Sequence, residues 1–209
     1  MRKLIIGWLL VIGIVSVGRA CEHCAALAVG NVVPAKVKYF GLKEVRLLDS
    51  PFKNAMDRNA AWMLEMDMDR LLSNFLKNAG LEPKGESYGS WESMGIAGHT
   101  LGHYLSAVSA LVERYEDAGL ARNLEKVVEG MYACQQAHGN GYLSAFPETD
   151  IEVLETRFTG VWAPYYTLHK IMQGLLDVYL RTGNEKAYAM VEGLAGYVDR
   201  RMSKLDPAT

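Results

Sequence analysis

The stretch from residue 91 to residue 115 has an unusual pattern of apolar and polar positions. On a helical wheel of about 100° per residue, one side collects Leu101, Tyr104, Leu105, Val108, Leu111, Val112 and Tyr115. The opposite side carries His99, Gly102, His103, Ser106, Ser109 and Ala110. A helix at a protein surface places charged residues opposite its apolar side. This helix is therefore predicted to pack closely against a neighbour or to line a cavity.

The rest of the chain contains further helical patterns. Ser50 and Pro51 are residue types preferred at a helix start, and the pattern predicts a helix from there to about residue 66. Additional helices are predicted over residues 68–79, 120–137, 162–180 and 185 to about 205. The 162–180 segment is apolar nearly all round, which indicates a buried helix.

Helices with little charge alternate with half-charged helices along the second half of the chain. The 91–115 and 162–180 segments carry little charge, whereas 120–137 and 185–205 are amphipathic with a charged side. This alternation is typical of an α/α toroid, in which inner helices line a central cavity. A helical-repeat solenoid gives a related pattern, but the chain shows no fixed-period repeat. We therefore predict an all-α fold of the toroid type.

Residues 29–50 lead into the first helix. Partial alternation predicts short β-strands at residues 37–40 and 45–48, with Gly41 between them.

The first 28 residues are predicted to be a signal peptide. Two basic residues precede an apolar run over residues 4–17, which has signal-peptide length and is short for a membrane span. Small residues at 18–20 or 26–28 offer cleavage sites. The protein is therefore expected to be secreted or periplasmic, with no membrane segment after cleavage. An uncleaved membrane anchor and a lipid-modified Cys21 are the alternatives.

Composition narrows the class of protein further. The 209 residues carry a formal net charge of −2 and no run of Lys or Arg, which argues against a nucleic-acid partner. Cys21 and Cys24 form a CxxC pair beside the predicted cleavage site. Cys134 falls on a predicted helix and is interpreted as a small core residue. No disulfide framework is expected.

His99 and His103 lie four residues apart, so both project from one side of their helix. That spacing permits two metal ligands, but the Glu of an HExxH motif is absent. No third ligand is evident from the sequence, although Glu92 or His169 could approach in space. The two other interpretations are histidines bonded to nearby backbone and polar groups lining a ligand cavity. A histidine ring both donates and accepts hydrogen bonds, as sugar hydroxyls require. We favour the cavity and predict no metal site in this chain.

Aromatic residues accompany these histidines. Trp91 and Glu92 lie in a Gly-rich loop, where an aromatic ring either plugs a core edge or stacks on a sugar. His169 shares one side of its helix with Trp162 and Tyr166, and these rings either face a sugar or belong to the core.

Motifs for nucleophilic catalysis are absent from the sequence. There is no GxSxG motif, phosphate loop or Ser/His/Asp arrangement. The acidic residues that could point inward are Glu92, Glu148, Asp150 and Glu155. Their spacing does not identify the pair of carboxylates that sugar hydrolysis commonly uses.

Three stretches follow one another along the chain: WESMGIAGHTLGHYLSA, GNGYLSAFP and WAPYYTLHKIMQGLLDVYLRTGN. In these stretches the chain resembles the N-terminal half of the glycoside hydrolase family 127 catalytic domain, the β-L-arabinofuranosidase group. The earlier segments FGLKEVRLLDSPF and LEMDMDRLLSNFLKNAGLEPKGESYGSWE are compatible with the same family. Together these stretches cover roughly residues 37–204.

This resemblance implies an (α/α)6-barrel catalytic domain, of which residues 51–209 are expected to form about half the ring. It also implies release of L-arabinofuranose, with retention, from arabinose-containing plant-type glycans. The best-studied members of this family use a zinc-bound cysteine nucleophile, with glutamates as acid/base and metal ligand, in the C-terminal half of the barrel. Cys134 does not match that nucleophile. We therefore expect zinc only in the complete family domain and no catalytic residue in this chain.

The motif positions imply pocket-lining, substrate-binding roles for six residues: His99, His103, His169, Trp91, Glu92 and Tyr166. The chain is expected to be a truncated, exported glycoside hydrolase that lacks its catalytic half and is inactive alone. The alternative is a non-catalytic helical module that binds a glycan or a protein through the same histidine-bearing face.

Overall fold

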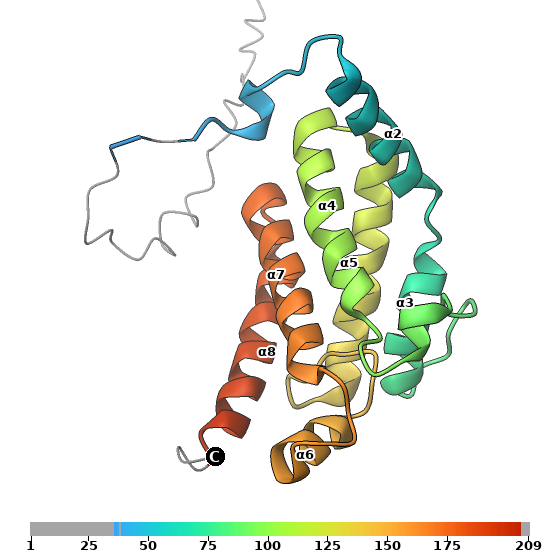
Figure 1. Cartoon of the computed structure of the whole chain (residues 1–209), viewed down its shortest axis with the longest axis vertical. Helices are drawn as coiled ribbons and strands as arrows, with labels where there is room; N and C mark the ends of the chain where they lie inside the picture. Colours follow the sequence, from blue (N-terminus) through green and yellow to red (C-terminus); the bar gives the residue numbers. More distant parts are fainter. Residues whose placement is uncertain (1–35, 38, 206–209) are drawn as a thin grey trace, which may run out of the picture. The chain divides into compact units, whose positions relative to one another are not determined.

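The computed structural model of the chain describes residues 36–37 and 39–205 (Figure 1). The chain divides into two units, Met1–Val37 and Lys38–Thr209, and every helix described below lies in the second. The helices are, in order, η1 (Leu42–Glu44), α2 (Pro51–Glu65), α3 (Met68–Asn78), η2 (Ser90–Ser93), α4 (His99–Tyr115), α5 (Ala118–His138), α6 (Glu148–Arg157), α7 (Pro164–Thr182) and α8 (Glu185–Met202). The predicted signal peptide and its two cysteines lie outside the described residues.

The all-α prediction is confirmed. Ser50 Oγ accepts a hydrogen bond from Lys53 N at 3.2 Å and Pro51 takes the first position of α2, so the helix starts where the sequence predicts. Asp67 caps the following helix α3 through two backbone amides. The described part of the chain contains no helix that is both long enough and apolar enough to cross a membrane.

The closest helix packing joins α4 to α7, and glycines permit it. A Cβ on Gly102 would lie 2.4 Å from the Lys170 carbonyl oxygen. A Cβ on Gly174 would lie 2.4 Å from the Gly102 carbonyl oxygen. A side chain at either position would therefore push the two backbones apart. The side of α4 that lacks charge packs against a neighbour along its middle, which is one of the two outcomes that its sequence predicts.

The core lies between α3, α4, α5, α7 and α8. Fully buried apolar side chains from these helices include Phe75, Leu105, Val127, Met131, Ile171, Leu175, Met190 and Leu194. Cys134 is also fully buried, which confirms it as a core residue, and burial raises the pKa of its thiol to about 12. The charged sides of α5 and α8 meet at the surface, where Lys186 pairs with Glu129.

The predicted strands are wrong for the described part of the lead-in. That part contains only the short 3-10 helix η1, and the side chains of Val37, Tyr39 and Phe40 are largely exposed. A strand needs a partner for its backbone hydrogen bonds, and neither segment has one within the described residues. Gly41 N instead donates to the Glu44 carboxylate at 2.7 Å and closes a local turn.

Helix α6 is not predicted by the sequence pattern. Ile151 is its one buried residue, so it has no apolar stripe to detect. Glu148 and Asp150 in its first turn are instead favourable beside the positive end of the helix dipole. Helix α7 begins at Pro164, slightly later than predicted, and this places Trp162 on the loop before it.

Candidate functional site

Five of the six predicted site residues gather around the N-terminal end of α4. A hollow of about 370 Å³, the histidine hollow, is lined by Trp91, Ile96, His99, Trp162, Ala163 and Tyr166. His99 is only 5% exposed, whereas Trp91 and Trp162 are 58% and 57% exposed. Broad aromatic surfaces therefore surround a buried imidazole.

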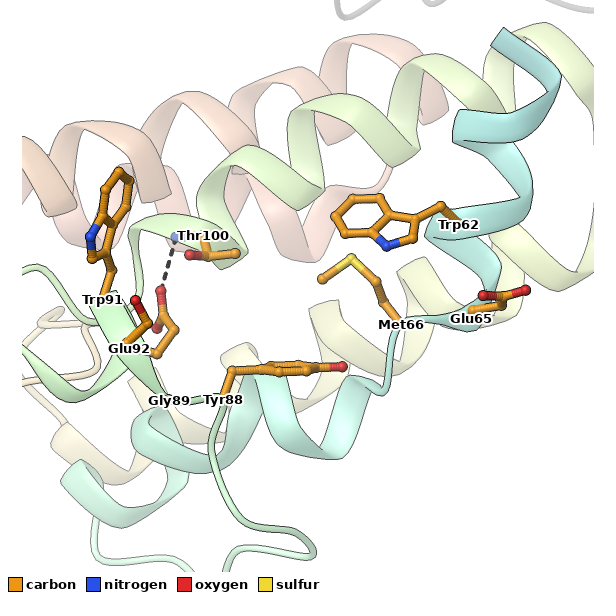
Figure 2. Close-up of a pocket in the computed structure, with 9 residues that line it drawn as sticks. Trp62, Glu65, Met66, Tyr88, Gly89, Trp91, Glu92 and Thr100 are labelled. Carbon is orange, nitrogen blue, oxygen red and sulfur yellow. Dashed lines mark hydrogen bonds between the residues drawn. The ribbon is translucent and has the colours of Figure 1, made fainter. Parts of the chain in front are cut away.

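The Glu92 carboxylate caps the start of α4. Its Oε2 accepts a hydrogen bond from Gly98 N at 2.6 Å, and its Oε1 accepts one from Thr100 N at 3.3 Å, drawn in Figure 2. Gly98 has a φ of 95° and no side chain that could cap the helix, so Glu92 supplies the missing acceptor. Asn74 holds Glu92 in turn by donating to its carbonyl oxygen at 2.6 Å. Glu92 thus positions the helix that carries both histidines.

His99 presents a hydrogen-bond acceptor. Its Nδ1–H donates to the Ile96 carbonyl oxygen at 2.6 Å, and a carbonyl only accepts, so the neutral ring is protonated at Nδ1. Nε2 then carries the lone pair. The ring lies among those of Trp91, His103 and Tyr166, at centroid distances of 5.7, 6.0 and 6.2 Å. His99 is both bonded to backbone and placed to line a cavity, so two of the interpretations from sequence apply together.

His103 lies one turn further along α4 and is more exposed than His99. Its Nε2 is 3.5 Å from the Tyr166 hydroxyl oxygen. Lys170 of α7 approaches the same tyrosine, with Nζ 5.1 Å from the ring centroid. Partial burial lowers the pKa of His103, and the positive charge of Lys170 lowers it further. His103 is therefore neutral near pH 7 and suited to exchange hydrogen bonds with hydroxyl groups.

His169 lies apart from the other two histidines. It lines a separate hollow of about 280 Å³ together with Tyr165, Leu168, Met172, Gln173, Leu176 and Val198. The structure therefore brings His99, His103, Tyr166, Trp91 and Glu92 together and leaves His169 outside that group.

A larger hollow adjoins the first and was not anticipated from the sequence. This tryptophan hollow, of about 440 Å³, is lined by Trp62, Glu65, Met66, Tyr88, Gly89, Ser90, Trp91, Glu92 and Thr100 (Figure 2). Trp91 borders both hollows. Trp62 is the residue from which the sequence could have suggested this hollow. It lies about 100° around α2 from Met63, the buried residue of that helix.

Two acidic residues of α6, Glu148 and Glu155, are engaged in structural contacts. Glu155 accepts hydrogen bonds from Arg201 Nη2 at 2.6 Å and Nε at 2.9 Å, which ties α6 to α8. Glu148 accepts one from Asn140 Nδ2 at 2.8 Å. Two of the four acidic residues that the sequence analysis considered as inward-facing acids therefore make contacts within the protein.

The described residues do not fit a zinc centre. No three His, Cys, Asp or Glu side chains come together among them in a way that could hold a metal ion. Zinc binds the thiolate form of cysteine, and the buried Cys134 thiol, with its raised pKa, disfavours that form.

Comparison with solved structures shows the fold of this domain. The chain is similar to the crystal structure of a GH127 beta-L-arabinofuranosidase from Geobacillus stearothermophilus T6, with a TM-score of 0.57 and 21% identity. The match covers 75% of this chain and 25% of that one, so the chain spans about a quarter of the length of that protein. At this identity the likeness establishes the fold, which is part of an all-α toroid.

The family follows from the sequence match. The family model described as "Beta-L-arabinofuranosidase, GH127 catalytic domain" matches residues 44–209. The chain therefore belongs to the GH127 family of glycoside hydrolase catalytic domains, and the predicted resemblance is confirmed. Comparison with the curated proteins gave no match.

Proposed function

We propose that this chain is the sugar-binding part of an exported β-L-arabinofuranosidase-like glycoside hydrolase. In this proposal the histidine hollow holds an L-arabinofuranosyl unit of an arabinose-containing plant-type glycan. Given that the chain belongs to this family, one observation supports the proposal. The exposed rings of Trp91, Trp162 and Tyr166 surround the buried His99 imidazole.

The chemistry of the hollow suits a sugar. A sugar ring has an apolar face of C–H groups and an edge of hydroxyls, and aromatic rings favour contact with such a face. In the neutral His99 ring with its proton on Nδ1, Nε2 can accept a hydrogen bond from a hydroxyl group. The Tyr166 hydroxyl and His103 Nε2 lie 3.5 Å apart, and both rings neighbour that of His99, so they offer a second polar pair beside it.

The residues of this chain would bind and orient the sugar. Both carboxylate oxygens of Glu92 accept from backbone amides at the start of α4, and Oε1 also lies 3.5 Å from His99 Nδ1. We assign Glu92 a positioning role and assign no nucleophile to this chain. Zinc belongs to the proposal only for the complete family domain, and hydrolysis by this chain alone is not expected.

Calorimetric titration of the chain with methyl β-L-arabinofuranoside tests the proposal. We expect saturable binding, and an about ten-fold weaker dissociation constant for His103→Ala, which loses one hydrogen-bonding group. His169→Ala distinguishes a site at the histidine hollow from a pocket shared by all three histidines. We expect unchanged affinity if the sugar binds in the histidine hollow, and a loss similar to that of His103→Ala if all three histidines share one pocket. Absence of binding contradicts the proposed function.

Catalysis and export are tested separately. Release of the aryl group from an aryl arabinofuranoside by this chain alone would contradict the purely binding role. Binding to a protein but to no sugar would instead favour the non-catalytic module. For export, N-terminal sequencing of the protein from the medium or periplasm is expected to find cleavage after position 20 or 28. A lipidated Cys21 or an intact terminus would contradict that expectation.

A further inference from the structure

We propose that the tryptophan hollow is a second sugar subsite, which takes a neutral unit next to the one in the histidine hollow. This inference rests on the proposed function, because it places a second unit of the same glycan.

Aromatic and apolar groups face each other across the tryptophan hollow. Figure 2 shows the Tyr88 ring on one side, with the Trp62 indole and the Met66 thioether on the other. The Arg70 guanidinium carbon lies 4.1 Å from the centroid of the Tyr88 ring, and the Tyr88 hydroxyl accepts from Asp67 N at 3.0 Å. Tyr88 is therefore held in place as a wall of the hollow. Trp62 leaves 56% of its surface exposed across from it.

Polar groups stand at the ends of this hollow. Figure 2 shows Glu65 at the end of α2, beyond Met66, and the Thr100 side chain towards Trp91. No cation among the described residues pairs with Glu65, so both of its oxygens can accept from hydroxyl groups. The lining contains carboxylates and no Lys, Arg or His, which disfavours an acidic sugar. A neutral, hydroxyl-rich ring fits this combination.

The two hollows share Trp91 as a common wall. Their volumes, about 440 and 370 Å³, each fall in the range of small-molecule sites. Consecutive units of a glycan could then pack on either side of one indole. This continuity distinguishes the tryptophan hollow from an isolated apolar depression.

The experiment compares two ligands by calorimetry on the whole chain. The ligands are methyl β-L-arabinofuranoside, which fills one hollow, and a trisaccharide of L-arabinofuranose units, which reaches both. We expect the trisaccharide to bind at least about ten-fold more tightly, and Trp62→Ala to remove about ten-fold of that affinity. Trp62→Ala should leave the affinity for the methyl glycoside unchanged. Phe52→Ala is the matched control, because Phe52 is an exposed aromatic on the same helix outside the hollow.

The outcomes separate the two proposals. Equal affinity of the wild type for both ligands, or full trisaccharide affinity in Trp62→Ala, overturns the second subsite and leaves the histidine hollow standing. Absence of binding of either ligand overturns both. If Trp62→Ala fails to fold by circular dichroism, Glu65→Gln replaces it, with an expected loss of about five-fold for the trisaccharide alone. An equal loss for both ligands in that variant also overturns the second subsite.

Discussion

Replacing Glu92 by glutamine tests how the start of α4 is held. The wild-type carboxylate accepts from Gly98 N at 2.6 Å and from Thr100 N at 3.3 Å, and Glu92 is 8% exposed. A glutamine amide has one acceptor oxygen, so its NH2 group would face one of these two N–H donors. That donor would then be left without a partner where little water can reach it.

The expected cost follows from these contacts. Losing a helix cap costs about 1 kcal/mol, and losing a negative charge near a helix N-terminus costs about 0.3–1 kcal/mol. A buried donor without a partner adds about 1 kcal/mol or more. Because these contributions overlap, we expect the free energy of unfolding to fall by about 2 kcal/mol. For a domain of this size the midpoint of thermal unfolding should drop by about 4–8 °C.

Chemical denaturation followed by far-UV circular dichroism measures the change for Glu92→Gln. Glu82→Gln is the matched control, because Glu82 is exposed in the loop after α3, and it should change stability by less than about 0.5 kcal/mol. If the two variants are equally stable, the cap does not hold α4.

Three other predictions concern the scaffold. Gly102→Ala should destabilise the fold by about 2–3 kcal/mol, because its Cβ would lie 2.4 Å from a backbone oxygen of α7. The control variant Gly196→Ala on α8 should be neutral or stabilising by up to about 1 kcal/mol. Equal melting temperatures of these two variants would contradict the close packing of α4 on α7. Arg201 holds the pKa of the Glu155 carboxyl below its usual value, chiefly through its hydrogen bonds. The stability that this pair contributes is therefore complete above the pKa of about 4.3 in the unfolded chain, and it is lost as the pH falls through the lower pKa of the folded protein. Arg201→Gln should therefore be less stable than wild type at neutral pH, and urea titrations should find a smaller difference below pH 4; a constant difference would refute the linkage. The Cys134 thiol, with a pKa raised to about 12, should react with a disulfide reagent only after unfolding, and fast labelling of the folded protein would contradict its burial.

The helices could be predicted because their signals are local. Ser50 and Pro51 specify the start of α2 through groups within three residues. An apolar side of the helix marks α4, α5 and α8. Helix α6 has no such stripe, since its single buried residue is Ile151. The prediction of strands in residues 37–40 and 45–48 was wrong for a related reason, because a strand depends on a partner strand that its own sequence does not contain.

The site could be predicted only in part. The spacing of His99 and His103 places both on one side of α4, and the structure keeps them together. The separation of His169 depends on which side of α7 packs against α4, and the close approach of Gly102 to the Lys170 backbone lies on that packed side. That contact is tertiary, and the pattern within α7 does not contain it.

The roles of individual site residues depend on folding between distant segments. Glu92 becomes a helix cap because the loop after η2 turns back at Gly98, whose φ is positive. Trp62 and Tyr88 meet across one hollow although they come from different segments, so neither suggests a site when considered alone.

Histidine and indole side-chain NMR signals, followed during titration with methyl β-L-arabinofuranoside, test the central claim most directly. The histidine hollow predicts that the signals of His99, His103 and Trp162 shift together and saturate, while those of His169 and Trp62 stay in place. Unchanged signals, or a shift of His169 as large as that of His103, would contradict the claim that this hollow binds the sugar.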